Sequence, residues 1–276
     1  MPELPEVETT RRGITPHLEG RRIRAITAQV AKLRQPLDVS ALNRLRGHTI
    51  TRVERRGKHL VLHADQTELA LHIHLGMSGA LRIVPADSPR KKHDHVTITL
   101  ENGQELRLHD PRRFGAVVWA PDENSGMAAK LLGGLGMEPL DGTFDAAAFH
   151  QRLKKRRAPI KQVLLAGDVV VGVGNIYVSE ALFHAGLHPA VPACRVSRPR
   201  ADRLHAAIRQ VLARAVEQGG STLRDFAAID GHAGHFQLEA AVYGREGQPC
   251  RACGTPIRRI AQGQRSTWFC PACQKR

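Results

Sequence analysis

The chain has 276 residues, with 41 Lys and Arg against 26 Asp and Glu and a formal net charge of +15. Its length exceeds that of one typical domain, so we expect two domains and a small appendage. The positive charge favours a polyanionic partner, nucleic acid first. An anionic membrane is the competing partner, but no apolar run reaches the roughly 18 residues that a membrane span needs, so we expect no membrane association.

The first 20 residues and the cysteines indicate the compartment. Residues 1–20 are charged and lack the apolar segment of a secretory signal, which predicts a cytoplasmic protein. Four of the five cysteines form two Cys-x-x-Cys pairs near the end of the chain. In a reducing compartment this pattern indicates a metal site rather than disulfides.

The opening residues, Met-Pro-Glu-Leu-Pro-Glu-Val-Glu, could place a reactive amine beside a carboxylate. Removal of Met1 would leave Pro2 with a secondary α-amine that titrates near neutrality. Such an amine can attack an aldehyde-like carbon and form an iminium ion. Glu3 could then act as a general acid or base. By itself, however, this stretch is more typical of a disordered chain end without chemistry.

The elements expected from the pattern fall into two regions. Residues 5–18 predict a helix with a proline in its first turn, and residues 21–120 alternate apolar and polar positions in short runs, with a hairpin turn at Asn102-Gly103. These runs predict a two-sheet antiparallel β-sandwich. The glycine-rich residues 121–145 predict a linker, and a helical pattern follows, with an apolar stripe over 204–216 that ends at Gly219-Gly220.

The terminal cysteines predict a structural zinc site. Sixteen residues separate the pairs, a spacing that lets four thiolates surround one Zn²⁺ tetrahedrally and leaves no open position for water. The ligands would be Cys250, Cys253, Cys270 and Cys273. Between the pairs we expect a β-hairpin that displays Arg265. The remaining cysteine, Cys194, is interpreted as an ordinary buried or half-buried thiol.

The stretch Val-Gly-Val-Gly-Asn-Ile-Tyr suits the binding of a phosphate. Its glycines let backbone amides approach an anion, and Asn175 adds a donor where a helix begins. A plain connection between two helices explains this stretch equally well. Five cations just upstream favour the phosphate interpretation. They are Lys154, Lys155, Arg156, Arg157 and Lys161.

Three places in the β region carry further candidates. Lys58 follows Arg-Arg-Gly at an expected turn. The loop after the strand ending in His-Ile-His-Leu could push Met77 outward. The turn Asp-Pro-Arg-Arg-Phe-Gly carries Arg112 and Phe114, a combination that can wedge a base stack while it holds phosphates.

Together these motifs, in this order, resemble those of the bacterial formamidopyrimidine-DNA glycosylases, and the resemblance covers the whole chain. It implies an α+β multidomain protein with an N-terminal antiparallel β-sandwich and its N-terminal helix, a helical helix-two-turn-helix domain and a C-terminal β-hairpin zinc finger. We expect domains at residues 1–130, 131–249 and 250–276. DNA would bind between the two large domains.

The resemblance also implies the reaction and its residues. The enzyme would excise oxidised purines such as 8-oxoguanine and formamidopyrimidines from double-stranded DNA, and cut the strand by β,δ-elimination. Pro2 would be the nucleophile at C1′, Glu3 the acid/base and Lys58 a general acid; Arg265 is counted with both the catalytic and the DNA-contacting residues.

The family's DNA contacts transfer by motif. Met77, Arg112 and Phe114 would fill the void left by the everted base. The phosphate contacts would be His93, Arg156, Lys161, Asn175 and Arg265. Residues 221–237 match the loop over the extruded base, one structural Zn²⁺ is the cofactor, and we expect a monomer.

Two departures and two alternatives stay open. The family's usual tyrosine after the catalytic lysine is His59, and an aromatic of the base-capping loop is His235, which puts the lesion preference in doubt. An endonuclease VIII-like glycosylase for oxidised pyrimidines shares the nucleophile. A zinc-finger DNA-binding protein without catalysis would explain the charge and the cysteines, but it would not need Pro2, Glu3 and Lys58.

Overall fold

The computed structural model describes residues 2–65, 70–120, 126–221 and 239–276. The chain divides into two compact units, Met1–Gly133 with Gly219–Gly234, and Gly134–Gln218 with His235–Arg276. The predicted base-capping loop and His235 lie outside the described residues, except for Ser221. The expected three-domain boundaries stay a prediction.

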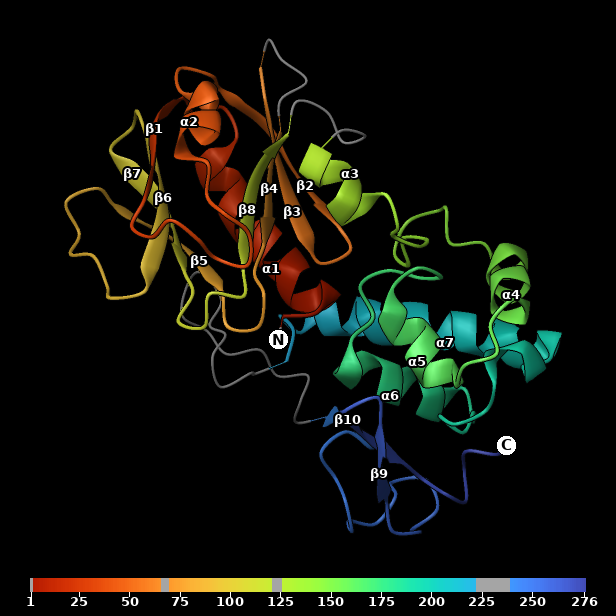
Figure 1. Cartoon of the computed structure of the whole chain (residues 1–276). Helices are drawn as coiled ribbons and strands as arrows, with labels where there is room; N and C mark the ends of the chain where they lie inside the picture. Colours follow the sequence, from red (N-terminus) through yellow and green to blue (C-terminus); the bar gives the residue numbers. More distant parts are fainter. Residues whose placement is uncertain (1, 66–69, 121–125, 222–238) are drawn as a thin grey trace. The chain divides into compact units, whose positions relative to one another are not determined.

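The first unit begins with helix α1 (Leu4–Leu18), which carries a proline in its first turn as predicted. Two four-stranded antiparallel sheets follow (Figure 1), in the orders β1-β6-β7-β5 and β2-β3-β4-β8, so the predicted β-sandwich is confirmed. The strands are β1 (Ile23–Ala28), β2 (Ile50–Arg56), β3 (His59–Ala64), β4 (Ala70–His74), β5 (Ala80–Pro85), β6 (Asp94–Leu100), β7 (Gln104–His109) and β8 (Ala116–Ala120). Two short helices, α2 (Val39–Leu42) and η1 (Asn43–Leu45), lie between β1 and β2.

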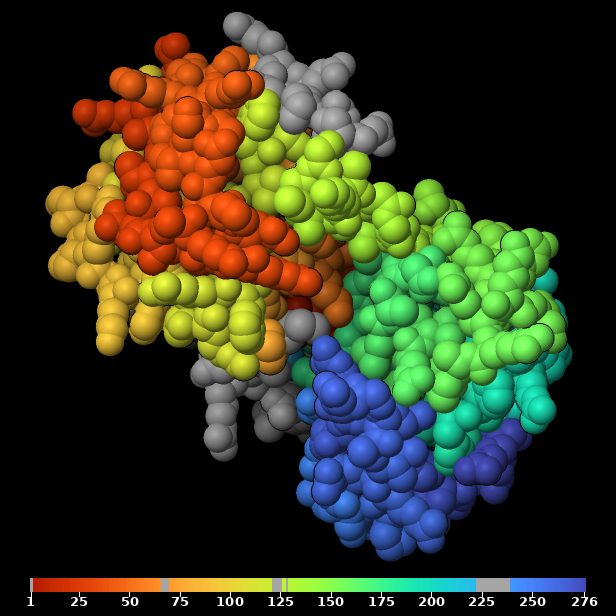
Figure 2. Space-filling model, viewed as in Figure 1, coloured from red at the N-terminus to blue at the C-terminus, as the bar shows by residue number. Residues whose placement is uncertain are grey.

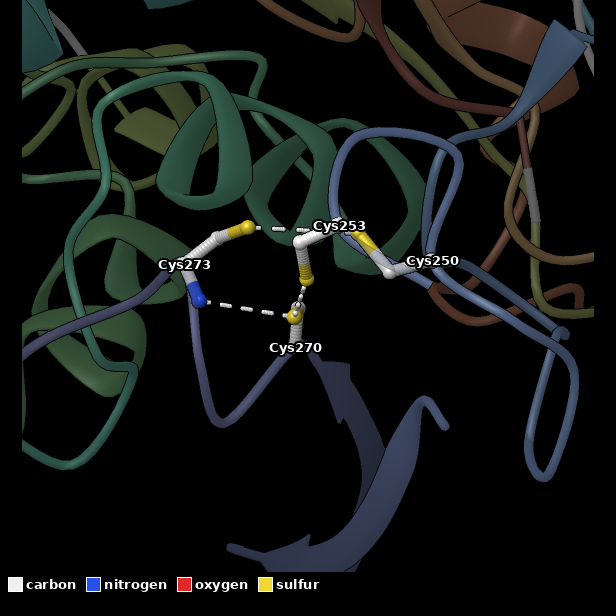
Figure 3. A group of neighbouring side chains, drawn as sticks. All are labelled: Cys250, Cys253, Cys270 and Cys273. Carbon is white, nitrogen blue, oxygen red and sulfur yellow. Dashed lines mark hydrogen bonds between the residues drawn. The ribbon is translucent and has the colours of Figure 1, made fainter. Parts of the chain in front are cut away.

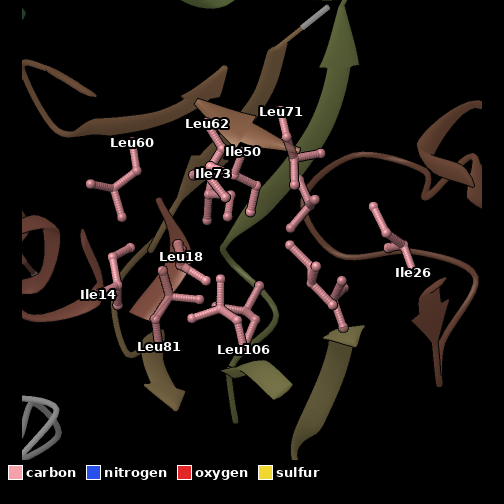
Figure 4. Close-up of a cluster of buried hydrophobic side chains, with 14 of the residues drawn as sticks. Ile14, Leu18, Ile26, Ile50, Leu60, Leu62, Leu71, Ile73, Leu81 and Leu106 are labelled. Atoms are coloured by element: carbon pink, nitrogen blue, oxygen red, sulfur yellow. The ribbon is translucent and has the colours of Figure 1, made fainter. Parts of the chain in front are cut away.

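The core of this unit comes from the alternation of the strands. Leu60 pairs with Ile73 and Leu62 with Leu71 across β3 and β4, and all four side chains point into one buried cluster (Figure 4). Helix α1 contributes Ile14 and Leu18 to the same cluster. Full burial of each such side chain contributes about 1.5–3 kcal/mol. Because side chains alternate along a strand, the histidines of β3 and β4 lie on the opposite face of this sheet.

The predicted hairpin turn is present, but the predicted linker is not wholly without regular structure. The β6–β7 hairpin turns at Asn102-Gly103, where Gly103 has φ +79°. The predicted linker, however, contains helix α3 (Gly126–Leu132), which packs against β8. Its sequence Met-Ala-Ala-Lys-Leu-Leu consists of good helix formers, although the glycines on both sides of it are typical of a linker.

The second unit is helical, with the finger at its end. Its helices are α4 (Ala146–Lys154), α5 (Ile160–Ala166), α6 (Asn175–His184), η2 (Ala193–Arg195) and α7 (Arg198–Glu217). The predicted apolar stripe of α7 is buried, and α7 packs against α4 and α6. The helix ends at Glu217, and Gly219 and Gly220 follow with φ +73° and +84°. In the described residues no helix is long and apolar enough to span a membrane.

The finger hairpin consists of β9 (Arg258–Gln262) and β10 (Arg265–Phe269), as predicted. Gly263 and Gln264 at its tip have φ +54° and +60°, and positive φ at both central residues is the mark of a tight type I′ turn. In the space-filling view (Figure 2) the finger, in blue, lies directly against the helical part of its unit, in green. Contacts between α6 and β10 account for this packing.

Candidate active site

The chain start is buried and fastened. Pro2 is buried and Glu3 is 3% exposed. The main-chain N–H of Glu3 donates to Oε2 of Glu6 at 2.8 Å. The other oxygen of Glu6, Oε1, accepts from the N–H of Ser221 at 2.7 Å and from its hydroxyl at 2.9 Å. One carboxylate therefore holds Glu3 in place, which is the opposite of a frayed chain end.

Lys58 lies in the two-residue loop that joins β2 and β3. Gly57 precedes it with φ +58°, a conformation that glycine adopts without strain at the first position of a tight hairpin. Arg55 ties this loop to helix α1, because its Nε lies 3.1 Å from a carboxylate oxygen of Glu8 and its Nη1 donates to the carbonyl of Gly57 at 3.1 Å. The loop with Lys58 is thus held beside the first turns of α1.

Glu8 stays ionised at neutral pH. Burial acts to raise the pKa of Glu8, but hydrogen bonds from Arg11 and Arg12, with the nearby charge of Arg55, lower it to about 2. A permanently charged Glu8 keeps the link between α1 and the Lys58 loop intact over the range in which most enzymes work.

Two histidines with rings tilted by 53° to each other lie next to the Lys58 loop. The rings of His59 and His74 are 4.7 Å apart between centroids. Burial lowers the pKa of His59 to about 3 and that of His74 to about 4, with smaller contributions from neighbouring histidines at His59 and from Lys58 and Arg34 at both rings. Both rings are therefore neutral at neutral pH. The Nδ1 atom of His74 lies 2.9 Å from the N–H of Gly76 and accepts from it, which places the ring proton on Nε2.

The predicted wedge residues point outward, as expected. Met77 is 38% exposed and Phe114 is 43% exposed, the two exposed large apolar side chains among the described residues. The guanidinium carbon of Arg112 lies 5.0 Å from the centre of the Phe114 ring, within cation–π range. Arg113 between them has φ +54°, so the turn is tight.

Asp110 joins the loop that carries Met77 to the loop that carries Phe114. Its carboxylate is fully buried, with Oδ2 accepting from the N–H of Gly115 at 2.7 Å and Oδ1 from the hydroxyl of Ser78 at 3.1 Å. Its N–H donates to the carbonyl of His93 at 2.9 Å. The loops touch backbone to backbone, because a Cβ on Gly76 would lie 2.3 Å from the main chain of Phe114. The loops that carry Met77, Arg112 and Phe114 are thus held against each other, and the backbone at His93 is held to the same aspartate.

The predicted phosphate contacts of the second unit differ in exposure. Arg265 and Arg156 are exposed, and Arg156 forms an ion pair with Asp168. Asn175 is the first residue of α6, after Gly174 as the N-cap. Lys161 is 0% exposed, and its ammonium donates to the finger strand β10. The roles of these four residues in DNA binding stay predictions.

The four predicted zinc ligands converge (Figure 3). Their sulfur atoms all lie within 4.8 Å of one another. The Sγ atoms of Cys253 and Cys270 are 3.5 Å apart and those of Cys250 and Cys273 are 4.0 Å apart. Four thiolates about 2.3 Å from one tetrahedral Zn²⁺ would be about 3.8 Å apart, so the site fits zinc.

The thiol chemistry also suits a cation. The hydrogen bond with Cys253 and burial raise the pKa of Cys273 to about 12, whereas hydrogen bonds from Thr255 lower the pKa of Cys253 to about 6. Four adjacent sulfurs cannot all carry negative charge without a compensating ion. A bound Zn²⁺ supplies that charge and holds the finger together.

Three buried acids, Glu6, Asp110 and Glu180, carry no role predicted from the sequence. Glu180 on α6 accepts main-chain hydrogen bonds from Ala241, Val242 and Tyr243 at 2.7–3.0 Å, and so anchors the segment that leads into the finger. Glu6 and Asp110 lie inside the opening motif and the Asp-Pro-Arg-Arg-Phe-Gly turn, and Glu180 follows Val-Gly-Val-Gly-Asn-Ile-Tyr by three residues.

Comparison with known proteins agrees with this geometry. Residues 1–117 match the formamidopyrimidine-DNA glycosylase N-terminal domain, 135–227 the H2TH domain of the same family, and 247–276 the zinc finger found in FPG and IleRS. The formamidopyrimidine-DNA glycosylase of Variovorax paradoxus is 59% identical over 276 residues, all of both chains. That of Bordetella pertussis is 54% identical over 278 residues, again all of both chains.

Solved structures share the whole fold. The MutM (Fpg) protein of Thermus thermophilus is 40% identical with a TM-score of 0.88, covering 99% of this chain and 98% of that one. The Lactococcus lactis Fpg in complex with DNA containing an abasic site is 35% identical with a TM-score of 0.90, covering 99% and 100%. With its two large parts and its finger all matched, the chain belongs to the formamidopyrimidine-DNA glycosylase family.

Proposed function

We propose that this protein is a bifunctional DNA glycosylase and AP lyase that everts oxidised purines, 8-oxoguanine and formamidopyrimidines, from double-stranded DNA, excises them and cuts the strand. The observation that carries the proposal is the chain start. Pro2 is buried and the N–H of Glu3 is bound by the buried Glu6, so the residues that would carry the chemistry are held in place. Chain ends are usually poorly ordered, so the fixed position of this one supports a role in the reaction.

The first step uses the amine of Pro2 after Met1 has been removed. Its lone pair attacks C1′ of the damaged nucleotide, the bond from C1′ to the base nitrogen breaks, and the base leaves with a proton. Opening of the sugar ring gives an iminium ion between Pro2 and C1′. Glu3 is the acid/base at this step, since a buried carboxyl can transfer a proton to the sugar.

The strand is then cut by two eliminations. The iminium makes the C2′ proton acidic, and its removal expels the 3′-phosphate by cleavage of the C3′–O bond. A second elimination breaks the C5′–O bond and releases the 5′-phosphate, and water hydrolyses the remaining iminium to free Pro2. Lys58 is the general acid that assists these departures. The neutral His59 and His74 beside it add no positive charge that would repel its ammonium.

DNA binding is divided among groups of different chemistry. Met77, Arg112 and Phe114 fill the space left by the everted base, which offsets an unstacking cost of a few kcal/mol. His93, Arg156, Asn175 and Arg265 bind the phosphates, and the net charge of +15 strengthens the attraction to DNA. The predicted contact Lys161 is buried against strand β10. The proposal includes a monomer that acts in the cytoplasm.

Borohydride trapping tests the nucleophile. Reduction of the iminium formed with an abasic oligonucleotide should give a stable adduct that peptide mapping places on residue 2. Protein with a blocked N-terminus is the matched control, and it should bind DNA without being trapped. Lys58→Ala distinguishes Pro2 from Lys58 as the nucleophile, because a Pro2 iminium should still form in that variant whereas a Lys58 Schiff base could not. An adduct on Lys58 would contradict the assignment.

A lesion panel tests the substrate class. We expect faster cleavage of duplexes with 8-oxoguanine opposite cytosine than of those with thymine glycol. The reverse order would favour an enzyme for oxidised pyrimidines. Duplex binding without cleavage of any lesion or abasic site would favour a DNA-binding protein without catalysis.

A further inference from the structure

One fully buried cation joins the helical region to the finger. Lys161 lies in the first turn of α5 and is among the largest side chains with no solvent exposure. Its Nζ donates to the carbonyl of Ser266 at 2.9 Å and to the hydroxyl of Thr267 at 2.7 Å. Thr267 is itself fully buried. A buried ammonium is retained only where such acceptors replace its water, so these two bonds fix β10 against α5.

A second helix holds the same point of the finger. Asn175 at the start of α6 donates from Nδ2 to the carbonyl of Ser266 at 3.2 Å. The hairpin tip also lies against α5, because a Cβ on Gly263 would be 3.4 Å from the side-chain nitrogen of Gln162. The backbone of β10 is therefore fastened at the residue that directly follows Arg265.

Arg265 lies between this fastening and the hairpin turn. On one side it follows Gln264, whose φ of +60° closes the turn, and it pairs in register with Gln262. On the other side the carbonyl of Ser266 is held by Lys161 and Asn175. The direction of the exposed Arg265 side chain thus depends on two constraints, of which the second comes from outside the finger.

We propose that Lys161 is a positioning residue that acts through Arg265, by setting the finger strand from which Arg265 reaches a phosphate. This inference rests on the proposed function, because it assumes that Arg265 binds DNA. An ammonium without solvent exposure reaches a phosphate only by giving up its bonds to β10. Removal of Lys161 should therefore weaken DNA binding by displacing Arg265, and should matter little when Arg265 is already absent.

A double-mutant cycle tests this dependence. Affinity for a duplex with a tetrahydrofuran abasic analogue is measured over a range of salt for Lys161→Met, Arg265→Ala and the double variant. We expect each single variant to bind roughly tenfold more weakly with a salt slope lowered by about one, and the double variant to match Arg265→Ala within about twofold. Lys130→Met removes an exposed lysine of α3 as the matched control.

Additive losses, with the salt slope lowered by about two in the double variant, would overturn the proposal, because Lys161 would then contact DNA itself. If Lys161→Met loses zinc or fails to fold, Thr267→Val provides a second test of the same contact. It removes the hydroxyl that accepts from Lys161 and keeps the shape of the side chain. We expect about threefold weaker binding that disappears in the Arg265→Ala background, and an equal loss in both backgrounds would contradict the proposal.

Hydrogen exchange separates this inference from the proposed function. In Lys161→Met with one zinc per chain, amides of residues 258–269 should exchange faster than in the wild type, while those of α7 should not change. Unchanged exchange in the hairpin would show that Lys161 does not fasten it. If the wild type neither bound nor cleaved damaged duplex, the proposed function would fail, and the exchange result would still decide whether Lys161 holds the strand.

Discussion

Glu6 and Ser221, 215 positions apart in the sequence, are joined by two hydrogen bonds to a single carboxylate oxygen of Glu6. The other oxygen of Glu6 holds the N–H of Glu3, next to Pro2. Gly220, with φ +84°, makes room for this contact, because a Cβ there would lie 2.9 Å from Oε1 of Glu6. One side chain therefore fixes both the chain start and the residue from which the predicted base-capping loop departs.

Glu6→Gln should disturb both ends of this link. An amide has one accepting oxygen, so its NH₂ group would face either the N–H of Glu3 or the N–H of Ser221. Leaving a buried donor without an acceptor costs about 1–3 kcal/mol, which urea unfolding measures. We also expect slower cleavage of abasic DNA, since Pro2 and Glu3 lose their support. Glu101→Gln, an exposed glutamate, is the control, and equal behaviour of the two variants would contradict the role of Glu6.

Asp110→Asn should impair base eversion in the same way as removal of the Phe114 side chain. The variant replaces one accepting oxygen by an NH₂ group, so either the bond from Gly115 or that from Ser78 is lost, and the loops that carry Met77 and Phe114 separate. Because an abasic site has no base to extrude, excision of 8-oxoguanine from a duplex should slow about tenfold or more while abasic cleavage changes little. Phe114→Ala should show the same pattern in single-turnover kinetics. Equal slowing on both substrates would indicate a general defect.

The stability of the protein should fall as the pH drops from about 6.5 to about 4. Burial lowers the pKa of His72 to about 4, so between these values the unfolded chain binds more protons than the folded one. Stability is thus complete above pH 6.5 and is lost on acidification, by about 2 kcal/mol for His72 between pH 7 and 5. His72→Leu should flatten this dependence in urea unfolding. An unchanged slope would mean that His72 takes up its proton as readily when folded as when unfolded.

Removal of zinc should abolish DNA binding before it affects the rest of the fold. The finger has a short hairpin and few buried apolar side chains, so its folding depends on the metal. We expect a chelator to release one zinc per chain and to weaken binding to damaged and undamaged duplex alike, as fluorescence anisotropy would show. Metal-stripped protein that kept normal affinity but lost cleavage would show that the zinc is not structural.

The sequence by itself determined the strands, helix α1, the end of α7 and the cysteine cluster, but not helix α3 in the predicted linker. Period-2 alternation in residues 70–74 and 94–109 places leucines and isoleucines on one face, which dictates a half-buried strand whatever surrounds it. The cysteine spacing has the same local character, because each pair occupies one tight turn. Short-range geometry is encoded in adjacent residues, so Asn102-Gly103 and Gly219-Gly220 ended their elements where predicted.

Only the tertiary structure decided how distant residues support the site. Glu6 with Ser221, Asp110 with Ser78 and Lys161 with Thr267 are contacts over 32–215 positions, and no local pattern specifies the partner of a buried charge. Lys161 makes the difference clear. In the sequence it is one of five cations suited to a phosphate track, yet folding removes it from water. A charge can be buried only where the fold supplies acceptors, and that supply depends on which strands and helices meet.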